Sequence, residues 1–209
     1  MLVLALDTAT ARITAGLVVL DGTAPRTLAA RDAAGSRAHA ELLAPAVRDL
    51  FAETGHARTD LDAIVVGLGP GPFTGLRVGL VTAAAMGDAL DRPVHGVPSH
   101  DAVAAGRPGR VLVVTDARRR EVYWSRYLDG VRTDGPSVSA PGDVDPGDAE
   151  VLGDAAFAVG APASAVPGPT PAGLVAVADL RAAPEPLRPL YLRRPDAVPP
   201  GAPKAVTRR

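Results

Sequence analysis

The sequence contains no cysteine. A disulfide, a thiolate nucleophile, an iron–sulfur cluster and a cysteine-containing zinc site are therefore excluded. Lysine is nearly absent, since Lys204 is the only one and every other basic residue is arginine, which argues against a Walker A loop or a lysine-based mechanism. The sequence also has no large excess of positive or negative charge, because it contains 22 Lys and Arg and 23 Asp and Glu. Any contact with nucleic acid must then be local.

The amino-terminal run favours a buried strand over a signal peptide. It is apolar from Leu2 to Leu6, has no basic residue before it, and reaches an acid at Asp7. The charge-free stretch Val78–Gly87 is too short to cross a bilayer. We therefore expect a cytoplasmic protein that makes no contact with a membrane.

Residues 1–106 have the pattern of one α/β lobe. Apolar runs predict strands, the first three as an antiparallel meander, over residues 2–6, 13–20, 26–31, 61–67 and 94–97. A 3.6-residue period predicts a helix from an N-cap at Ser36 to a stop at Gly55. A second helix runs from the Gly-Pro turn at residues 69–72 to about Leu90, and a shorter one follows Pro98.

Residues 107–195 repeat this pattern weakly. Two predicted strands, 110–115 and 121–128, flank a polar turn, which indicates an internal duplication. From Pro136 onward prolines recur so often that only short elements fit, and we expect a smaller, Pro-rich second lobe. Residues 196–209 have few apolar side chains beyond Ala and Val and are expected to form a disordered tail.

The segment from Gly67 to Gly75 follows a strand and opens a helix, where backbone N–H groups often bind phosphate. Pro70 and Pro72 each remove an N–H donor, so a tight turn explains the segment better.

The segment Asp7-Thr8-Ala9-Thr10 also has two interpretations. Kinases and ATPases of the sugar kinase and actin type place a phosphate- and magnesium-binding turn at this position, and the alternative is an Asx or ST turn closing a hairpin.

Small residues recur every four positions in the second helix, at Gly75, Gly79, Ala83 and Gly87, and therefore lie along one side. Each interior glycine costs roughly 0.5–1 kcal/mol, which a close helix contact would repay. Two interpretations stay open: burial against the chain's own sheet and neighbouring helix, or packing against a helix of a partner protein.

Other candidate sites are weaker. No second ligand lies one helical turn from His39, so no metal site is expected, and no Gly-x-Ser-x-Gly elbow supports serine catalysis. Three consecutive arginines, 118–120, occupy a turn before Tyr123 and Trp124. They would suit RNA phosphates, although a solvated hairpin tip above half-buried aromatics fits the pattern better.

Three motifs together resemble the TsaB family, also called YeaZ, in order and spacing. They are His39-Ala-Glu-Leu-Leu43-Ala-Pro45, Gly67-Leu-Gly69-Pro-Gly71-Pro-Phe73-Thr74-Gly75-Leu76-Arg77-Val-Gly79, and Asp116-Ala-Arg-Arg-Arg-Glu121-Val-Tyr123. The resemblance covers about residues 1–130. It implies a two-lobed α/β fold of the actin/Hsp70/sugar kinase type, with duplicated ribonuclease H-like lobes and mixed sheets flanked by helices.

The resemblance also implies a function. In this family the chain is a non-catalytic subunit that supports the transferase TsaD in forming threonylcarbamoyladenosine next to the anticodon of tRNAs that read ANN codons. TsaD and TsaE would be partner proteins, tRNA would be reached through the complex, and the chain would also form a homodimer. The His-x-x-x-His pair that holds the metal of TsaD is absent here. We expect no cofactor and no catalytic residue in this chain, and leave open whether a nucleotide sits at the interface shared with TsaD.

Carried onto this sequence, the interface for TsaD and for the homodimer lies on the first two helices. Its residues are His39, Leu42, Pro45, Gly75, Arg77, Gly79 and Ala83. The alternatives are an active ATPase or kinase of the same fold, and a glycoprotease, for which the sequence offers neither a metal pair nor a nucleophile.

Overall fold

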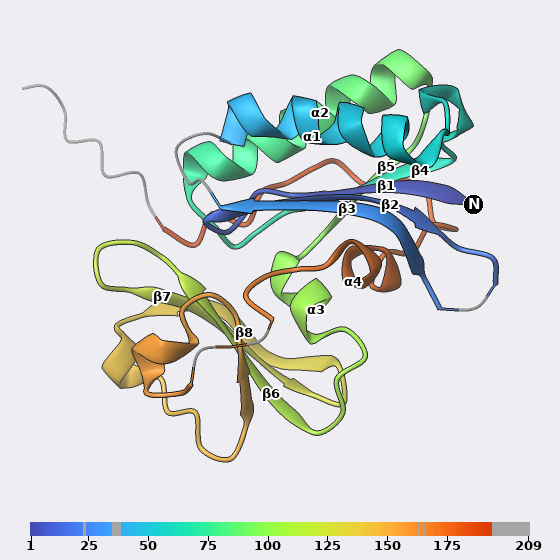
Figure 1. Cartoon of the computed structure of the whole chain (residues 1–209). Coiled ribbons are helices and arrows are strands. Elements are labelled where there is room, and N and C mark those ends of the chain that lie inside the picture. Colours follow the sequence, from blue (N-terminus) through green and yellow to red (C-terminus); the bar gives the residue numbers. More distant parts are fainter. Residues whose placement is uncertain (23, 35–38, 163, 165, 194–209) are drawn as a thin grey trace, which may run out of the picture.

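A computed structural model describes residues 1–22, 24–34, 39–162, 164 and 166–193. The chain folds into two lobes, each built on a mixed β-sheet (Figure 1). The expected N-cap at Ser36 and the expected tail 196–209 lie outside the described residues.

The first sheet has the strand order β3-β2-β1-β4-β5. The first three strands form the expected antiparallel meander, whereas β4 runs parallel to β1 and β5 parallel to β4. The central strand β1 is buried along its whole length, which explains its unbroken apolar run. The strands are β1 (Leu2–Asp7), β2 (Arg12–Val19), β3 (Arg26–Ala34), β4 (Ala63–Gly67) and β5 (Val94–Val97).

Helices cover both faces of this sheet. The two long ones, α1 (His39–Thr54) and α2 (Phe73–Leu90), lie next to each other on its outer face, and a short 3-10 helix, η1 (Arg58–Asp60), follows α1 (Figure 1). Leu43 and Leu50 of α1 fill the core between helices and sheet. The shorter helices α3 (Ser99–Ala104) and α4 (Pro171–Ala176) lie on the inner face, between the two sheets.

The second sheet has the order β8-β7-β6-β9, which repeats that of the first four strands of the first sheet. Two antiparallel pairs and one parallel pair recur as well, so the expected duplication and the expected two-lobed α/β fold with mixed sheets and flanking helices are confirmed. Its elements are β6 (Arg110–Asp116), β7 (Val122–Leu128), β8 (Val131–Ser139), β9 (Glu150–Leu152) and the 3-10 helices η2 (Pro141–Asp143) and η3 (Ala156–Val159).

Strand β8 passes through Pro136, where the sequence predicted only short elements. It lies at the edge of the sheet, and its register with β7 shifts between Trp124 and Arg126. An edge strand tolerates proline because it needs backbone hydrogen bonds on one side only.

The end of the described chain returns to the first lobe, so the expected second lobe of residues 107–195 is not one structural unit. Thr170 caps α4 by accepting a hydrogen bond from the Gly173 N–H, and Leu174 is fully buried against Val3 and Val65 of the first sheet. Further along, the Leu190 N–H donates to the carbonyl oxygen of Leu68 at 2.8 Å. Leu174 and Val175 of α4 cover an apolar face of the first sheet that would otherwise meet water.

Helix α3 joins the lobes through His100. Its imidazole is buried, with Nδ1 2.8 Å from Ser125 Oγ on β7 and Nε2 2.9 Å from Thr115 Oγ1 on β6. Burial, followed by the charge of Arg132, lowers the pKa of His100 to about 3. The ring is therefore neutral at physiological pH and acts as a hydrogen-bonded link between the lobes.

Candidate functional site

The Asp7 carboxylate ends β1 inside the protein. Its Oδ2 accepts a hydrogen bond from Ser99 Oγ at 2.5 Å, and its Oδ1 accepts one from the Ala9 N–H at 2.8 Å. Burial raises the pKa of Asp7 to about 6, although both hydrogen bonds act to lower it. The Asx turn expected as the simpler interpretation is confirmed, and both carboxylate oxygens are engaged within the chain.

The Thr8 hydroxyl is likewise engaged. It donates to the Gly75 carbonyl oxygen at 2.7 Å and accepts from the Gly79 N–H at 3.0 Å, which ties the turn to the first part of α2. Gly71 lies against the Ala9 carbonyl so closely that a Cβ at this position would overlap it. The glycine-rich segment is therefore a tight connection packed directly against the Asp7 turn.

The stripe of small residues on α2 faces the interior. Gly75, Gly79 and Ala83 are buried, and a Cβ on Gly79 would lie 2.5 Å from Thr8 Oγ1. Burial against the chain's own first lobe is thus the correct interpretation of the stripe. The prediction that these three residues lie on a partner surface is therefore wrong. Their side of α2 is already packed against the chain itself, and a larger side chain there would disturb the fold.

The opposite side of α2 is open. Val81 is 66% exposed, Arg77 is exposed, and Pro45 is exposed on the neighbouring α1. Leu42 is half-buried between this surface and the core. His39 begins α1, and its side chain lies outside the described part of the chain. The charge-free run of α2 therefore leaves an apolar surface uncovered, which is typical of a protein contact.

A pair of aromatic rings lies at the start of α2, and the sequence analysis predicted no contact between them. Phe73 is 48% exposed and Tyr191 is 42% exposed, and their ring centroids lie 5.1 Å apart. The Arg77 guanidinium lies over the Phe73 ring, 3.9 Å from its centroid. Only the return of the chain to the first lobe brings Tyr191 here, so no local pattern signals the pair.

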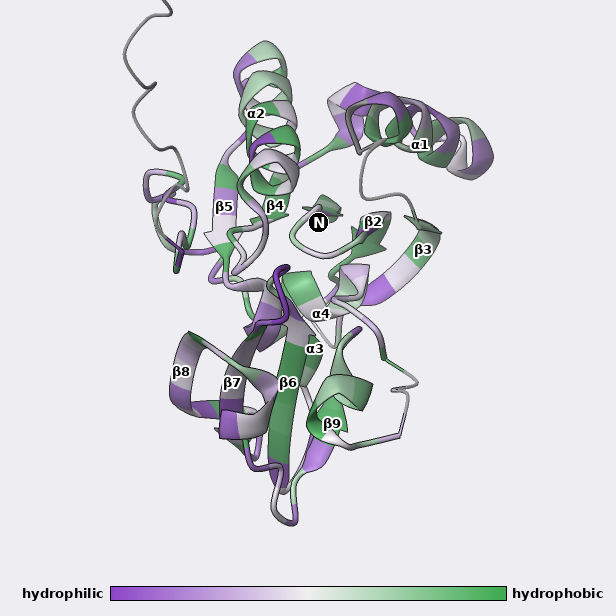
Figure 2. Cartoon of the chain, turned by 90° about the vertical axis from the view of Figure 1, so that its left-hand side faces the viewer, coloured by the Kyte–Doolittle hydropathy of each residue, from purple (hydrophilic) through white to green (hydrophobic). Residues whose placement is uncertain are grey.

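The arginine turn lies between β6 and β7, at the junction of the lobes, where Figure 2 shows a strongly hydrophilic connection. Arg118, Arg119 and Arg120 are exposed and have positive φ angles of 63°, 52° and 63°. The Arg193 guanidinium holds the turn, donating to the Ala117 carbonyl oxygen at 3.1 Å and pairing with Glu121 at 2.8 Å. The three arginines are exposed at a turn, as the sequence predicted, and of the strand aromatics that follow Tyr123 is buried and Trp124 is half-buried.

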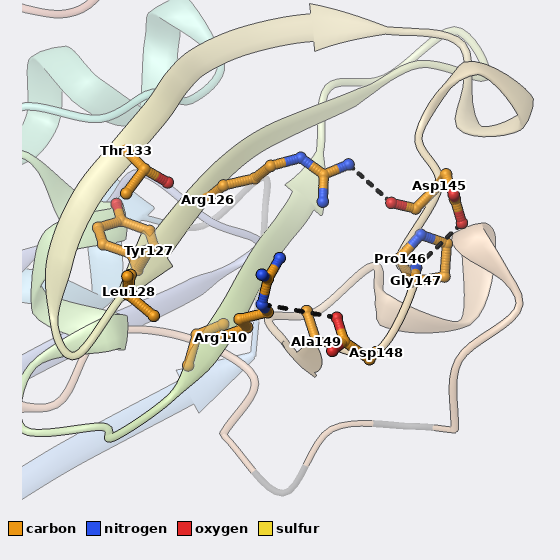
Figure 3. A pocket seen from close by; sticks show the side chains of 11 residues that line it. Arg110, Arg126, Tyr127, Leu128, Thr133, Asp145, Pro146, Gly147, Asp148 and Ala149 are labelled. Atoms are coloured by element: carbon orange, nitrogen blue, oxygen red, sulfur yellow. Dashed lines mark hydrogen bonds and ion pairs between the residues drawn. The ribbon is translucent and has the colours of Figure 1, made fainter.

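A separate pocket of about 550 Å³ lies at the far end of the second sheet (Figure 3). Arg126 donates to the Asp145 carbonyl oxygen at 2.7 Å, and Arg110 lies 3.9 Å from the Asp148 carboxylate. The pocket's arginines are therefore directed toward the chain's own loop. None of the residues that the sequence singled out lines this pocket.

The described residues contain no group of three or more His, Asp or Glu side chains placed to hold a metal ion. Among the helices of the described chain, none has the length and apolar character needed to span a membrane.

Comparison with known proteins identifies relatives of the whole chain. Residues 32–154 match the family model described as TsaD, tRNA N6-adenosine threonylcarbamoyltransferase. An uncharacterized protein of Mycobacterium leprae is 56% identical over 202 residues, which cover 95% of this chain and 56% of that protein. The tRNA threonylcarbamoyladenosine biosynthesis protein TsaB of Escherichia coli is 36% identical over 132 residues, 61% of this chain and 55% of that protein. The chain thus spans about half the length of these two relatives.

The structural comparison agrees. The solved structure of YeaZ from Pseudomonas aeruginosa superposes with a TM-score of 0.74 at 31% identity, covering 91% of this chain and 99% of that one. Both lobes are therefore shared. The chain belongs to the TsaB/YeaZ family.

Proposed function

We propose that this chain is a non-catalytic subunit of threonylcarbamoyladenosine formation, which binds TsaD and supports its transfer reaction next to the anticodon of tRNAs that read ANN codons. The names of its relatives support the pathway. The observation that carries the role is the uncovered face of α1 and α2. The Asp7 turn, on the other side of α2, supports it, because the Asp7 and Thr8 side chains are hydrogen-bonded within the chain.

The proposed interface for TsaD is the open face of the two long helices. Of the residues expected there, Pro45 and Arg77 are exposed and Leu42 is half-buried, and the structure adds Val81. Gly75, Gly79 and Ala83 are buried and contribute indirectly; the small size of Gly79 lets α2 sit close to Thr8 of the Asp7 turn. A second copy of the chain would use the same face, so homodimer and TsaD complex should compete. TsaE would join this assembly, and tRNA would be reached through it.

The experiment that tests this interface is co-elution of purified chain and TsaD on size exclusion. Val81→Glu places a charge on the exposed apolar face of α2 and should abolish co-elution without changing the melting temperature. Val131→Glu is the matched control, since Val131 is 69% exposed on β8 of the other lobe. Equal co-elution of both variants would contradict the proposed interface.

A second experiment separates a supporting subunit from an active ATPase or kinase. Cells depleted of the chain are complemented with wild type or Asp7→Asn, and threonylcarbamoyladenosine in bulk tRNA is measured by mass spectrometry. Rescue by both supports a subunit in which Asp7 is structural. Rescue by wild type alone, with equal amounts of folded protein, would favour catalysis at Asp7, and unchanged tRNA on depletion would refute the pathway.

A further inference from the structure

A strip of arginines and exposed aromatic rings crosses the junction between the lobes. We call it the junction strip, and it consists of Phe73, Arg118, Arg119, Arg120, Tyr191 and Arg193. Its parts are connected by contact: the Tyr191 ring lies against Phe73, and Arg193, two residues further on, binds the arginine turn through Ala117 and Glu121. The strip is thus a continuous surface built from three segments that are distant in the sequence.

The junction strip contains four arginines, two of which pair with acidic residues next to the strip. Arg118 pairs with the neighbouring Asp116 at 3.1 Å, and Arg193 pairs with the neighbouring Glu121. Arg120 is exposed and makes no ion pair within the described residues. In a chain whose net charge is −1, this is a local concentration of guanidinium groups. Three of these guanidinium groups come from consecutive residues, and all three residues have a left-handed backbone conformation.

Guanidinium groups beside exposed aromatic rings match the chemistry of single-stranded RNA. Arginines bind phosphates along a backbone, and an aromatic face stacks on an unpaired base. Duplex RNA would use the arginines only, because its bases are already stacked, and an acidic protein would not need the open ring of Tyr191. The two features together favour an RNA loop.

We propose that the junction strip binds a single-stranded RNA loop, with Arg118, Arg119 and Arg120 on its phosphates and a base stacked on Tyr191. The identification of that loop as part of a tRNA rests on the proposed function. Arg77 of the proposed TsaD interface lies over Phe73, so the two surfaces adjoin. Arg120 and Tyr191 are not assigned to that interface, and substitutions there and at Val81 therefore test RNA binding and TsaD binding separately.

The test is fluorescence anisotropy of the full-length chain with a labelled RNA hairpin that has a single-stranded loop, compared with a fully duplex RNA of equal length. Arg120→Gln should weaken loop binding and reduce the salt dependence by about 0.7 in log–log slope for each phosphate that is no longer neutralised. Tyr191→Ala should weaken it between about fivefold and about a hundredfold. Arg110→Gln is the control, because its side chain is 71% exposed at the far end of β6.

Several results would overturn the proposal. Equal affinity for loop and duplex RNA would remove the role of Tyr191, and an equal loss in Arg110→Gln would show general charge attraction only. Unchanged RNA affinity in Arg120→Gln with loss of TsaD co-elution would assign the strip to a protein contact. Loop binding that responds as expected, while wild type fails to co-elute with TsaD, would support the junction strip and refute the proposed function.

Discussion

Replacing Asp7 by Asn is expected to change how the free energy of unfolding depends on pH. Burial raises the pKa of this carboxyl from 3.8 to about 6. A rise of about two pKa units corresponds to about 3 kcal/mol. Asn has nearly the same shape and carries no charge at any pH, so the substitution removes this contribution while Ser99 and Ala9 keep a polar partner.

The sign follows from the direction of the shift. In wild type the stability that Asp7 contributes is fully present below about pH 4, where it is protonated in both folded and unfolded chains, and is lost as pH rises through about 6. The unfolding free energy of the variant minus that of wild type should therefore be constant below about pH 4. It should rise between about pH 4 and 6 and level off about 3 kcal/mol higher.

The assay is urea unfolding followed by circular dichroism, from acid to mildly alkaline pH, with the difference between the two proteins taken at each pH. Taking the difference cancels other titrating groups, above all His100, whose pKa is shifted in the opposite direction. Asp88→Asn on α2 is the control for removal of an exposed carboxylate. A difference that stays flat, or that falls as pH rises, would refute the argument that Asp7 is buried with an energetic cost at neutral pH.

Three further predictions concern packing. His100→Ala should lower the free energy of unfolding by about 2–4 kcal/mol at neutral pH, because the Thr115 and Ser125 hydroxyls lose their partner. Wild type should also lose stability as the pH falls below 6.5, since the pKa of His100 is lowered in the folded chain. The variant should not show this pH-dependent loss. Gly79→Ala should cost about 1–3 kcal/mol in thermal unfolding, and a neutral effect would contradict the contact with Thr8. Leu174→Ala should cost about 2–5 kcal/mol by urea unfolding; a much smaller loss would mean that α4 is not part of the first lobe's core.

Local sequence patterns determined much of the fold. The apolar runs located the first meander and the strand pair 110–128. The 3.6-residue period located α1, and the Gly-Pro turn at residues 69–72 marked the start of α2. These predictions succeed because alternation and helical period report which side of an element is buried. The Asp7 turn, the glycine-rich turn and the arginine turn were also found, since each has a distinctive local composition.

Tertiary structure alone decided what each buried side meets. A stripe of small residues indicates close packing, but Thr8 and the first sheet, not a partner, lie against Gly79. Ser99 binds Asp7, Tyr191 reaches Phe73, and α4 closes the first lobe from beyond the second one. These contacts join segments far apart in the chain, and no local period encodes them. The sequence specifies which surfaces must leave water, and only the packing of the whole chain selects the surface that covers each of them.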